Sequence, residues 1–320
     1  MAPSAPKQKK HAAPQVGNEK HRLVNCRPVV ALKSGLLSSI RDFFHAHGYL
    51  EVETPVVVPT PALELHIDAC RAGRDFLRTS PELHMKRLLC AGYERIFQVG
   101  PCFRAGERGN LHNPEFTMLE WYRAKADYMD ILDETRELLL HCAHKCLGRT
   151  WIDKNGVRIN LSAEWQIFSV AGLFEKYAGW NPAVNFDEKR FEADLLSRVE
   201  PRLPKDRPVI LMDYPAELAA LARLKKDDRR LAERWELYLG GIEIANAFSE
   251  LTDASEQRKR FEDCARKRAV MGAEAYEPDA EFLAALEDGM PECAGIAIGI
   301  DRLVMIFAGN DSLDQVIPFR

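Results

Sequence analysis

One strand-like stretch, residues 115–123, carries an acidic side chain among apolar ones. The two-residue period of a strand places four of its side chains on one face: Phe116, Met118, Glu120 and Tyr122. A glutamate in such a row is costly to bury unless a positive group meets it. Glu120 is therefore a candidate for binding an ammonium group.

A pair of acids lies in a predicted hairpin that turns at Gly240–Gly241. In this hairpin Glu243 lies opposite Tyr238. Glu236 lies opposite Ala245, which makes the two glutamates diagonal neighbours on one face. Two facing carboxylates repel each other unless a cation lies between them, and Mg²⁺ is the natural candidate. The alternative interpretation is an acidic face exposed to solvent.

Two further polar residues follow in the second strand of this hairpin. Asn246 and Glu250 have the opposite strand parity to Glu243. A β-bulge near Ala245 must reset the register if all three side chains line one pocket.

Two arginines stand at strand ends, where phosphate groups could bind. Arg302 follows a predicted strand-to-helix turn, so that backbone N–H groups and the guanidinium could meet the same phosphate. Arg104 ends another strand. The P-loop and the Rossmann glycine motif are both absent from the sequence. Acids for an ammonium group, arginines for phosphates and a carboxylate pair for a metal together suggest activation of an amino acid by ATP.

The composition is that of a globular protein, with 46% hydrophobic and 29% charged residues in a chain of 320. The net charge of -4 argues mildly against a nucleic-acid-binding protein. No apolar run could span a bilayer, and no secretory signal is present. The eight cysteines include no C-x-x-C pair, so we expect reduced thiols in a cytoplasmic protein. Cys142 and Cys146 share a helix face that a metal could use, but two core residues are the simpler interpretation.

The periodicity predicts an α+β fold with a mainly antiparallel sheet flanked by helices. Residues 1–26 show no period and are predicted to be a disordered tail, whereas residues 27–320 form the catalytic domain. The predicted helices begin near Val30, at Ser80, at Asp127, at Asp253 and at Asp301. The predicted strands and hairpins are 95–104, 115–123, 151–161, 208–215, 235–251 and 294–300.

Five segments, in the expected order, resemble the motifs of class II aminoacyl-tRNA synthetases in their lysyl form. Residues 48–55 resemble motif 1, residues 103–120 motif 2 and residues 295–302 motif 3. Residues 80–87 and 243–253 complete the set. The resemblance covers about Val30 to Arg320 and implies the catalytic fold of this class.

Within this class the chain resembles the elongation factor P–lysine ligases more closely. Only a short segment precedes motif 1, where a lysyl-tRNA synthetase would carry an anticodon-binding domain. Residues 80–85 and 119–123 are similar to the ligase versions of these segments. Ala297 stands where lysyl-tRNA synthetases usually have glycine, and this change suits a β-amino acid.

The resemblance implies a nucleotide site around motifs 2 and 3. Arg104 would bind the α-phosphate, Arg302 the γ-phosphate, and Phe116 would stack on adenine. The remaining members of the implied ATP site are Ala105, Gly106, Glu107, His112, Asn113, Glu243, Ile244 and Gly299. Glu236 and Glu243 would carry Mg²⁺.

The resemblance also implies an amino-acid site. Glu82, beside Ser80 and Pro81, would receive the amino group near the carboxylate. The ε-ammonium group would be received by Glu120, Tyr122, Asn246 and Glu250. Ala297 would line this pocket.

Motif 2 departs from the family pattern at one position. The usual Arg-x-Glu is here Arg104-Ala105-Gly106-Glu107, so the acid comes one residue later. Recognition of the adenine edge then depends on whether a shifted loop lets Glu107 take the missing place.

These observations predict formation of a lysyl- or β-lysyl-adenylate from ATP, followed by transfer to a lysine of elongation factor P. The acceptor is acidic in this family, so we expect a basic patch beside the site, no tRNA substrate, no membrane association and a homodimer through motif 1. The sequence leaves α-lysine and (R)-β-lysine both open. Two alternatives are a minimal enzyme that acylates a tRNA acceptor stem and a catalytically silent paralogue acting as a regulatory subunit.

Overall fold

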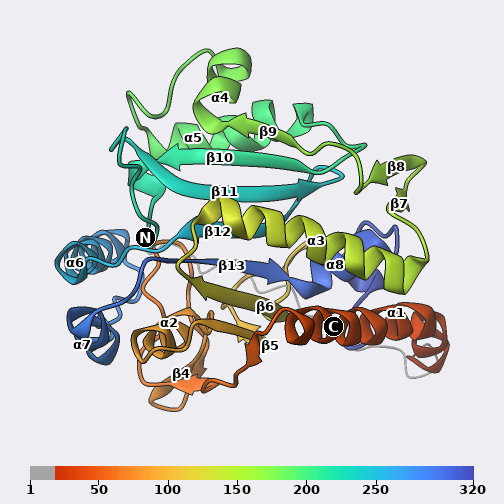
Figure 1. Cartoon of the computed structure of the whole chain (residues 1–320), viewed down its shortest axis with the longest axis horizontal. Helices are drawn as coiled ribbons and strands as arrows, with labels where there is room; N and C mark the ends of the chain where they lie inside the picture. Colours follow the sequence, from red (N-terminus) through yellow and green to blue (C-terminus); the bar gives the residue numbers. More distant parts are fainter. Residues whose placement is uncertain (1–18) are drawn as a thin grey trace, which may run out of the picture.

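The computed structural model describes residues 19–320, and an eight-stranded sheet forms its centre (Figure 1). The strands follow in the spatial order β1 (Leu50–Glu51), β5 (Arg95–Phe103), β6 (Glu115–Ala124), β13 (Cys293–Gly299), β12 (Ile242–Ser249), β11 (Leu231–Leu239), β10 (Val209–Pro215) and β9 (Gln166–Ser169). Only the outer pairs, β1 with β5 and β9 with β10, are parallel. The predicted α+β fold with a mainly antiparallel sheet is confirmed.

Two small sheets accompany the large one. The first has the order β2 (Val57–Val58), β4 (Asp75–Leu77) and β3 (Arg71–Ala72). The second is the predicted hairpin at Asn155–Gly156, formed by β7 (Trp151–Lys154) and β8 (Val157–Asn160).

Helices α1 (Glu19–Ala46), α3 (Tyr128–Leu147) and α8 (Ile300–Phe307) cover one face of the large sheet, whereas the others pack around the ends of the opposite face, which carries the site described below. The other helices are α2 (Glu82–Cys90), α4 (Val170–Ala178), α5 (Glu188–Asp194), α6 (Ala254–Met271) and α7 (Ala280–Asp288). Figure 1 shows α1, α3 and α8 lying across the same side of the sheet. The main hydrophobic core fills the space between these helices and the alternate strand positions, such as Leu119, Trp121 and Ile296.

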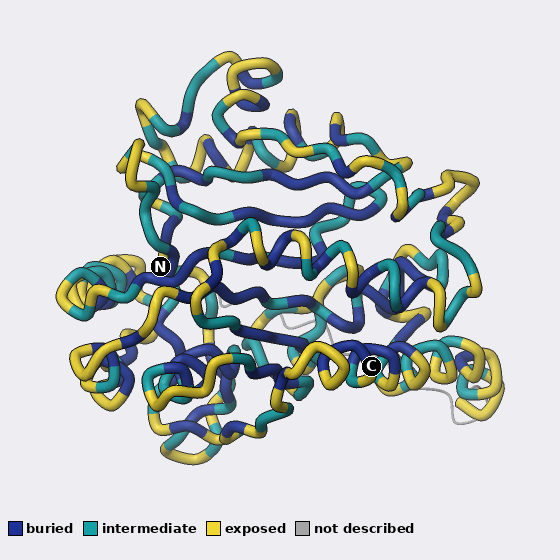
Figure 2. Tube along the Cα trace, in the orientation of Figure 1, coloured by how far each residue is buried: buried dark blue, intermediate teal, exposed yellow. Residues whose placement is uncertain are grey.

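The buried residues in Figure 2 follow the central strands, whereas exposed residues concentrate on the outer helices. A second core packs α2, α6 and α7 around Phe282 and Leu283. A third packs α4 and α5 against β10. No helix within residues 19–320 combines the length and the apolar character needed to cross a membrane.

The first helix begins earlier than the sequence predicted. It runs from Glu19 and continues through Pro28, although an interior proline removes one backbone hydrogen bond. The segment 1–26 was predicted to be a disordered tail, but its last eight residues, 19–26, belong to this helix. The rest of that prediction, residues 1–18, lies outside the described residues.

The other helix boundaries follow their sequence signals. Asp127 caps α3 by accepting hydrogen bonds from the N–H groups of Met129 and Asp130, and Gly148 ends this helix with φ of 66°. Asp253 caps α6 in the same way, as predicted. At α2, the Ser80 hydroxyl accepts from the N–H of Glu82 at 2.9 Å, but the capping position itself is Pro81.

Candidate functional site

Side chains predicted to bind the substrates form a row across four neighbouring strands, on the face of the sheet opposite α1, α3 and α8. Glu120 of β6 pairs with Ala297 of β13, and Ala297 pairs on its other side with Asn246 of β12. Asn246 in turn pairs with Glu236 of β11. Residues far apart in the sequence are thus aligned by the register of the sheet.

A bulge in the β11–β12 hairpin makes this alignment possible. Glu243 lies opposite Tyr238, as predicted, but the register shifts before the next pair, leaving one extra residue in β12. The prediction that Glu236 lies opposite Ala245 is wrong, because this shift pairs Glu236 with Asn246. The expected bulge near Ala245 is confirmed, and it returns Glu243 and Asn246 to one face.

An outer cavity of about 370 Å³ lies at one end of this row. Its lining includes most of the residues predicted to bind ATP and Mg²⁺: Arg104, Glu107, His112, Asn113, Phe116, Glu236, Glu243, Ile244, Gly299 and Arg302. The Arg104 guanidinium lies 5.2 Å from the centre of the Phe116 ring, and its buried Nε has no partner among residues 19–320. A guanidinium with an unpartnered Nε beside an aromatic ring fits a nucleotide phosphate and base.

Arg302 connects the loop after β5 to the β11–β12 hairpin. It donates to the carbonyl oxygens of Leu111 at 3.0 Å and Glu243 at 3.1 Å, and to Nε2 of His112 at 2.7 Å. Burial lowers the pKa of His112, and the charge of Arg302 lowers it further. The neutral imidazole can therefore accept this hydrogen bond at neutral pH.

The shifted acid of motif 2 reaches the outer cavity. Gly106 has φ of +76°, a conformation that glycine adopts without strain, and it turns the chain between Arg104 and Glu107. Glu107 lines the cavity and lies 4.0 Å from Arg104, whereas Ala105 and Gly106 are absent from its lining.

The two predicted metal ligands also line the outer cavity. Burial raises the pKa of Glu243 to about 7, and the nearby charge of Glu236 contributes to this rise. Glu236 is held in place by Tyr214 at 2.5 Å, Arg234 at 2.7 Å and Tyr238 at 3.1 Å. No cluster of three or more His, Cys, Asp or Glu side chains suited to a metal occurs within residues 19–320. Two carboxylates in a cavity that also holds two arginines fit Mg²⁺, which takes its other ligands from phosphates and water.

An inner cavity of about 120 Å³ lies at the other end of the row. It is lined by six of the predicted amino-acid-binding residues: Ser80, Glu82, Glu120, Tyr122, Asn246 and Ala297. Glu120 accepts hydrogen bonds from Ser80 Oγ at 2.6 Å and Tyr122 Oη at 2.8 Å. Burial raises the pKa of Glu120 to about 7, and the charge of Glu82 adds to the effect.

Two predicted members, Pro81 and Glu250, do not line the inner cavity. Glu250 is fully buried and forms an ion pair with Lys86, which is 1% exposed and donates to Glu82 at 2.6 Å. Burial raises the pKa of Glu250 to about 8. Burial also opposes the charge on Lys86, but Glu250 and Glu82 outweigh it and raise the pKa of Lys86.

Three residues of the site were missed from the sequence: Glu64, Lys86 and Arg234. Lys86 lies four residues after Glu82 on one helix, so the spacing could have indicated the ion pair. Arg234 has the strand parity of Glu236, and it donates to Asn246 at 3.1 Å. Glu64 lies in no periodic segment of the sequence. Only the tertiary structure shows that it reaches the cavities.

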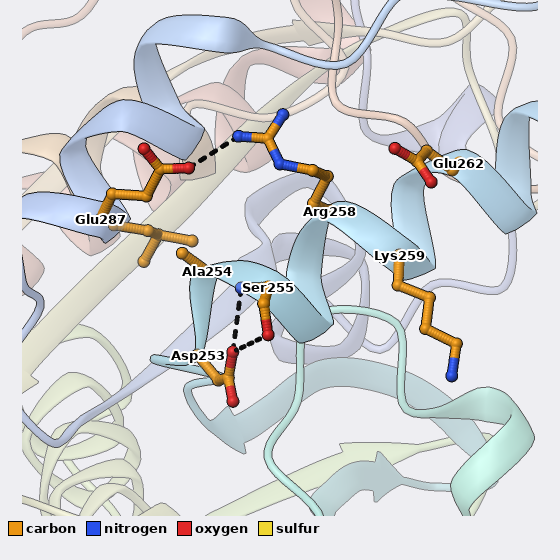
Figure 3. Close-up of a pocket in the computed structure, with 8 residues that line it drawn as sticks. Asp253, Ala254, Ser255, Arg258, Lys259, Glu262 and Glu287 are labelled. Carbon is orange, nitrogen blue, oxygen red and sulfur yellow. Dashed lines mark hydrogen bonds and ion pairs between the residues drawn. The ribbon is translucent and has the colours of Figure 1, made fainter.

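A separate surface hollow lies where α6 begins, beside the end of α7 (Figure 3). Three of its charged groups are engaged, because Arg258 pairs with Glu287 at 2.8 Å and Asp253 caps α6. The other two, Lys259 and Glu262, are exposed on the surface of α6, so the hollow lacks the buried charges that distinguish the two cavities.

The chain belongs to the class II tRNA synthetase family (D, K and N), whose family model matches residues 20–320. Three similar proteins are all named elongation factor P–(R)-beta-lysine ligase. They come from Proteus mirabilis (40% identical, covering 90% of this chain and 93% of the relative), Sodalis glossinidius (40%, 90% and 93%) and Klebsiella pneumoniae strain ATCC 700721 (39%, 91% and 94%). The predicted resemblance is confirmed, and the protein is an enzyme of this ligase type.

Proposed function

We propose that the protein uses ATP to form the adenylate of lysine or (R)-β-lysine and transfers the aminoacyl group to a lysine side chain of elongation factor P. The observation that carries this proposal is the pair of connected cavities. The outer one has arginines and a carboxylate pair, and the inner one has buried acids. The names of the relatives support the choice of acceptor.

In the first step, a carboxylate oxygen of the amino acid attacks the α-phosphorus of ATP, and pyrophosphate leaves. Arg104 would neutralise the α-phosphate, and Arg302 would hold the γ-phosphate end. Glu236 and Glu243 would hold Mg²⁺, which when bound neutralises charge on the leaving pyrophosphate. The chain contributes mainly by positioning and by charge, because this displacement needs no proton transfer.

The acids of the inner cavity would select an amino acid with a distal ammonium group. Glu120 is held by two hydroxyl donors, and a ligand ammonium would stabilise its ionised form. Glu250 pairs with Lys86 behind the cavity, so it would act on the ligand ammonium through the electrostatic potential and not by direct contact. Both groups favour a diamino acid over a neutral side chain of similar length.

In the second step, the amine of the acceptor lysine attacks the carbonyl carbon of the adenylate, and AMP leaves. The acceptor must approach over the outer cavity, where Arg108 is exposed on the loop next to Glu107. Arg108 forms no ion pair within the described chain, residues 19–320. We propose it as part of the basic surface for an acidic acceptor. A cytoplasmic location also remains a prediction.

The homodimer expected from motif 1 also remains a proposal. It is supported by apolar side chains that are exposed in motif 1, on the helix before it and on the strand after it: Leu50 (52%), Val24 (60%), Val30 (46%) and Val57 (50%). Sedimentation velocity would test it, since a single species at the monomer mass would contradict the dimer.

Two observations bear on the alternatives. A silent paralogue is expected to lose its catalytic charges, yet Arg104, Arg302 and the carboxylate pair meet in one cavity. Acylation of tRNA is distinguished from acylation of elongation factor P by the experiment below.

The test is the intact mass of elongation factor P after incubation with the enzyme, ATP and either lysine or (R)-β-lysine. The expected result is a gain of one aminoacyl unit, lost in Arg302→Ala and retained in Arg258→Ala, a control in the hollow of Figure 3. No gain, with pyrophosphate exchange still driven by lysine, would exclude this acceptor, and tRNA charging would then be measured.

A further inference from the structure

One acid that the sequence did not single out stands where the two cavities meet. Glu64 lines both of them, as do Arg104 and Ala297. Arg104 marks the end of the site where the carboxylate of the amino acid and the α-phosphate must come together. Glu64 is therefore placed beside the reacting end of the amino acid, and the charges that act on it include those of Arg104 and Glu82.

Glu64 differs from the other acids of the inner cavity because its carboxylate is free. Glu82 pairs with Lys86, and Glu120 accepts from two hydroxyl groups. The Glu64 carboxylate has no hydrogen-bond or ion-pair partner in the described part of the chain, residues 19–320. Burial raises its pKa, and the charge of Arg104 opposes this rise. A cationic ligand group would relieve the cost of burying this carboxylate.

The backbone at Glu64 is fixed from outside the cavities by a buried arginine of α6. Arg268 is 0% exposed and donates to the carbonyl oxygens of Glu64 at 2.7 Å, Leu65 at 3.1 Å and Ile67 at 3.0 Å. It also donates to the carbonyl oxygen of Glu274 at 2.7 Å. Most of the donors of this fully buried guanidinium bind one loop, so they hold that loop in position. Glu64 is thus presented to the cavities by a rigid support.

We propose that Glu64 binds the proximal amino group of the substrate, the ammonium nearest its carboxylate. This inference rests on the proposed function, in which the substrate is a diamino acid. The distal ammonium lies toward Glu120, and the carboxylate faces Arg104. Glu64 then shares the proximal ammonium with Glu82, whose Oε1 already accepts from Lys86.

The test compares ligands with and without the proximal amine in wild-type enzyme and in Glu64→Gln. Lysine and (R)-β-lysine carry this amine, whereas 6-aminohexanoate keeps the carboxylate and the distal amine but lacks it. The first two are measured as kcat/KM for pyrophosphate exchange. The third is measured as a competitive inhibition constant, which requires binding but not turnover.

The expected result is a loss of roughly 10- to 100-fold in kcat/KM for the diamino acids, mostly through KM, as for a lost charge-assisted hydrogen bond. In the same comparison of Glu64→Gln with the wild type, the inhibition constant of 6-aminohexanoate changes by less than about threefold. Glu64→Asp, which keeps the carboxylate, recovers part of the loss. Glu262→Gln, an exposed acid in the separate hollow of Figure 3, leaves all three values unchanged.

An equal loss for all three ligands would overturn the proposal, because it would show a general effect on the fold or the potential. Unchanged kinetics with the diamino acids would overturn it as well. Wild-type enzyme that exchanges pyrophosphate with neither diamino acid would instead refute the proposed function, so the two failures are distinguishable.

Discussion

Replacing Glu120 by glutamine tests the energetic cost of the acidic pocket. The wild-type carboxyl is 1% exposed, and burial raises its pKa from 4.5 to about 7. The hydroxyl donors Ser80 and Tyr122 lower this pKa, but they do not cancel the effect of burial. Glutamine has almost the same shape and carries no charge. It should remove the electrostatic penalty and, with it, the ammonium-binding group.

The size of the effect follows from the pKa change. A rise from 4.5 to about 7 corresponds to about 3 kcal/mol of folding free energy, at about 1.4 kcal/mol per pH unit. The amide of glutamine donates at one of its two ends, so one hydroxyl loses its acceptor, at a cost of about 1 kcal/mol. Glu120→Gln should therefore be more stable than the wild type by about 2 kcal/mol at pH 8. This corresponds to a rise in Tm of roughly 4–8 °C.

The pH dependence has a definite sign. Between pH 4.5 and about 7 the folded wild type keeps a proton on Glu120 that the unfolded chain has lost. Wild-type stability therefore falls as the pH rises through this window, and the advantage of the variant grows to a plateau above pH 7. Below pH 4.5 the carboxyl is neutral in both states, so only the lost hydrogen bond remains and the variant should be less stable than the wild type by about 1 kcal/mol.

Thermal unfolding without ligands at pH 4, 5, 6, 7 and 8 measures this difference, with the exposed Glu262→Gln as the control for a surface charge change. Pyrophosphate exchange in the same samples should fall at least about tenfold in the Glu120 variant. A variant that is no more stable than wild type at pH 8, or an advantage that does not depend on pH, would refute the reasoning.

Four other substitutions separate the parts of the site. Gly295→Ala would place a Cβ 2.3 Å from the Tyr122 ring, so pyrophosphate exchange should fall by at least about tenfold and Tm should drop, while an unaltered enzyme would contradict this packing. Arg302→Ala should slow exchange by about 10²- to 10³-fold, and an effect below about tenfold would contradict a phosphate-binding role. Arg108→Glu should leave exchange intact but lower kcat/KM for elongation factor P more strongly at low salt, and a loss independent of salt would contradict steering. Arg320 donates to the carbonyl oxygen of His112 at 2.8 Å, so Arg320→Ala should raise the KM for ATP with little change in the KM for lysine, and equal changes in both would contradict a local effect on the loop.

Periodicity predicted the local structure of the hairpins and the strand face of Glu120, because these depend on short-range alternation. The β11–β12 hairpin shows the limit of this approach. Its turn at Gly240–Gly241 and the pair Tyr238–Glu243 follow from sequence, but the strand position of Glu236 depends on where the extra residue is accommodated. The chemical requirement that Glu243 and Asn246 share one pocket indicated a bulge before the structure located it.

The buried charges mark the other limit. Lys86 lies at a helical spacing from Glu82, so its first partner could be inferred, whereas its second, Glu250, is 164 residues away in sequence, a separation that no local pattern spans. Glu64 stands in a segment without regular structure whose place is set by Arg268, a residue 204 positions later. Such contacts are set by tertiary packing.

The row from Glu120 to Glu236 also fixes the distance between the two ends of the site. Three steps between adjacent strands, each about 4.8 Å, separate the two ends by about 14 Å, and backbone hydrogen bonds fix this length. A strand cannot slip by one residue to suit a longer substrate, because the slip would turn its side chains to the opposite face. The length of acyl chain that the site accepts can therefore be changed only by changing the length of a side chain at either end. A change from Glu to Asp, for example, alters it by about one methylene group.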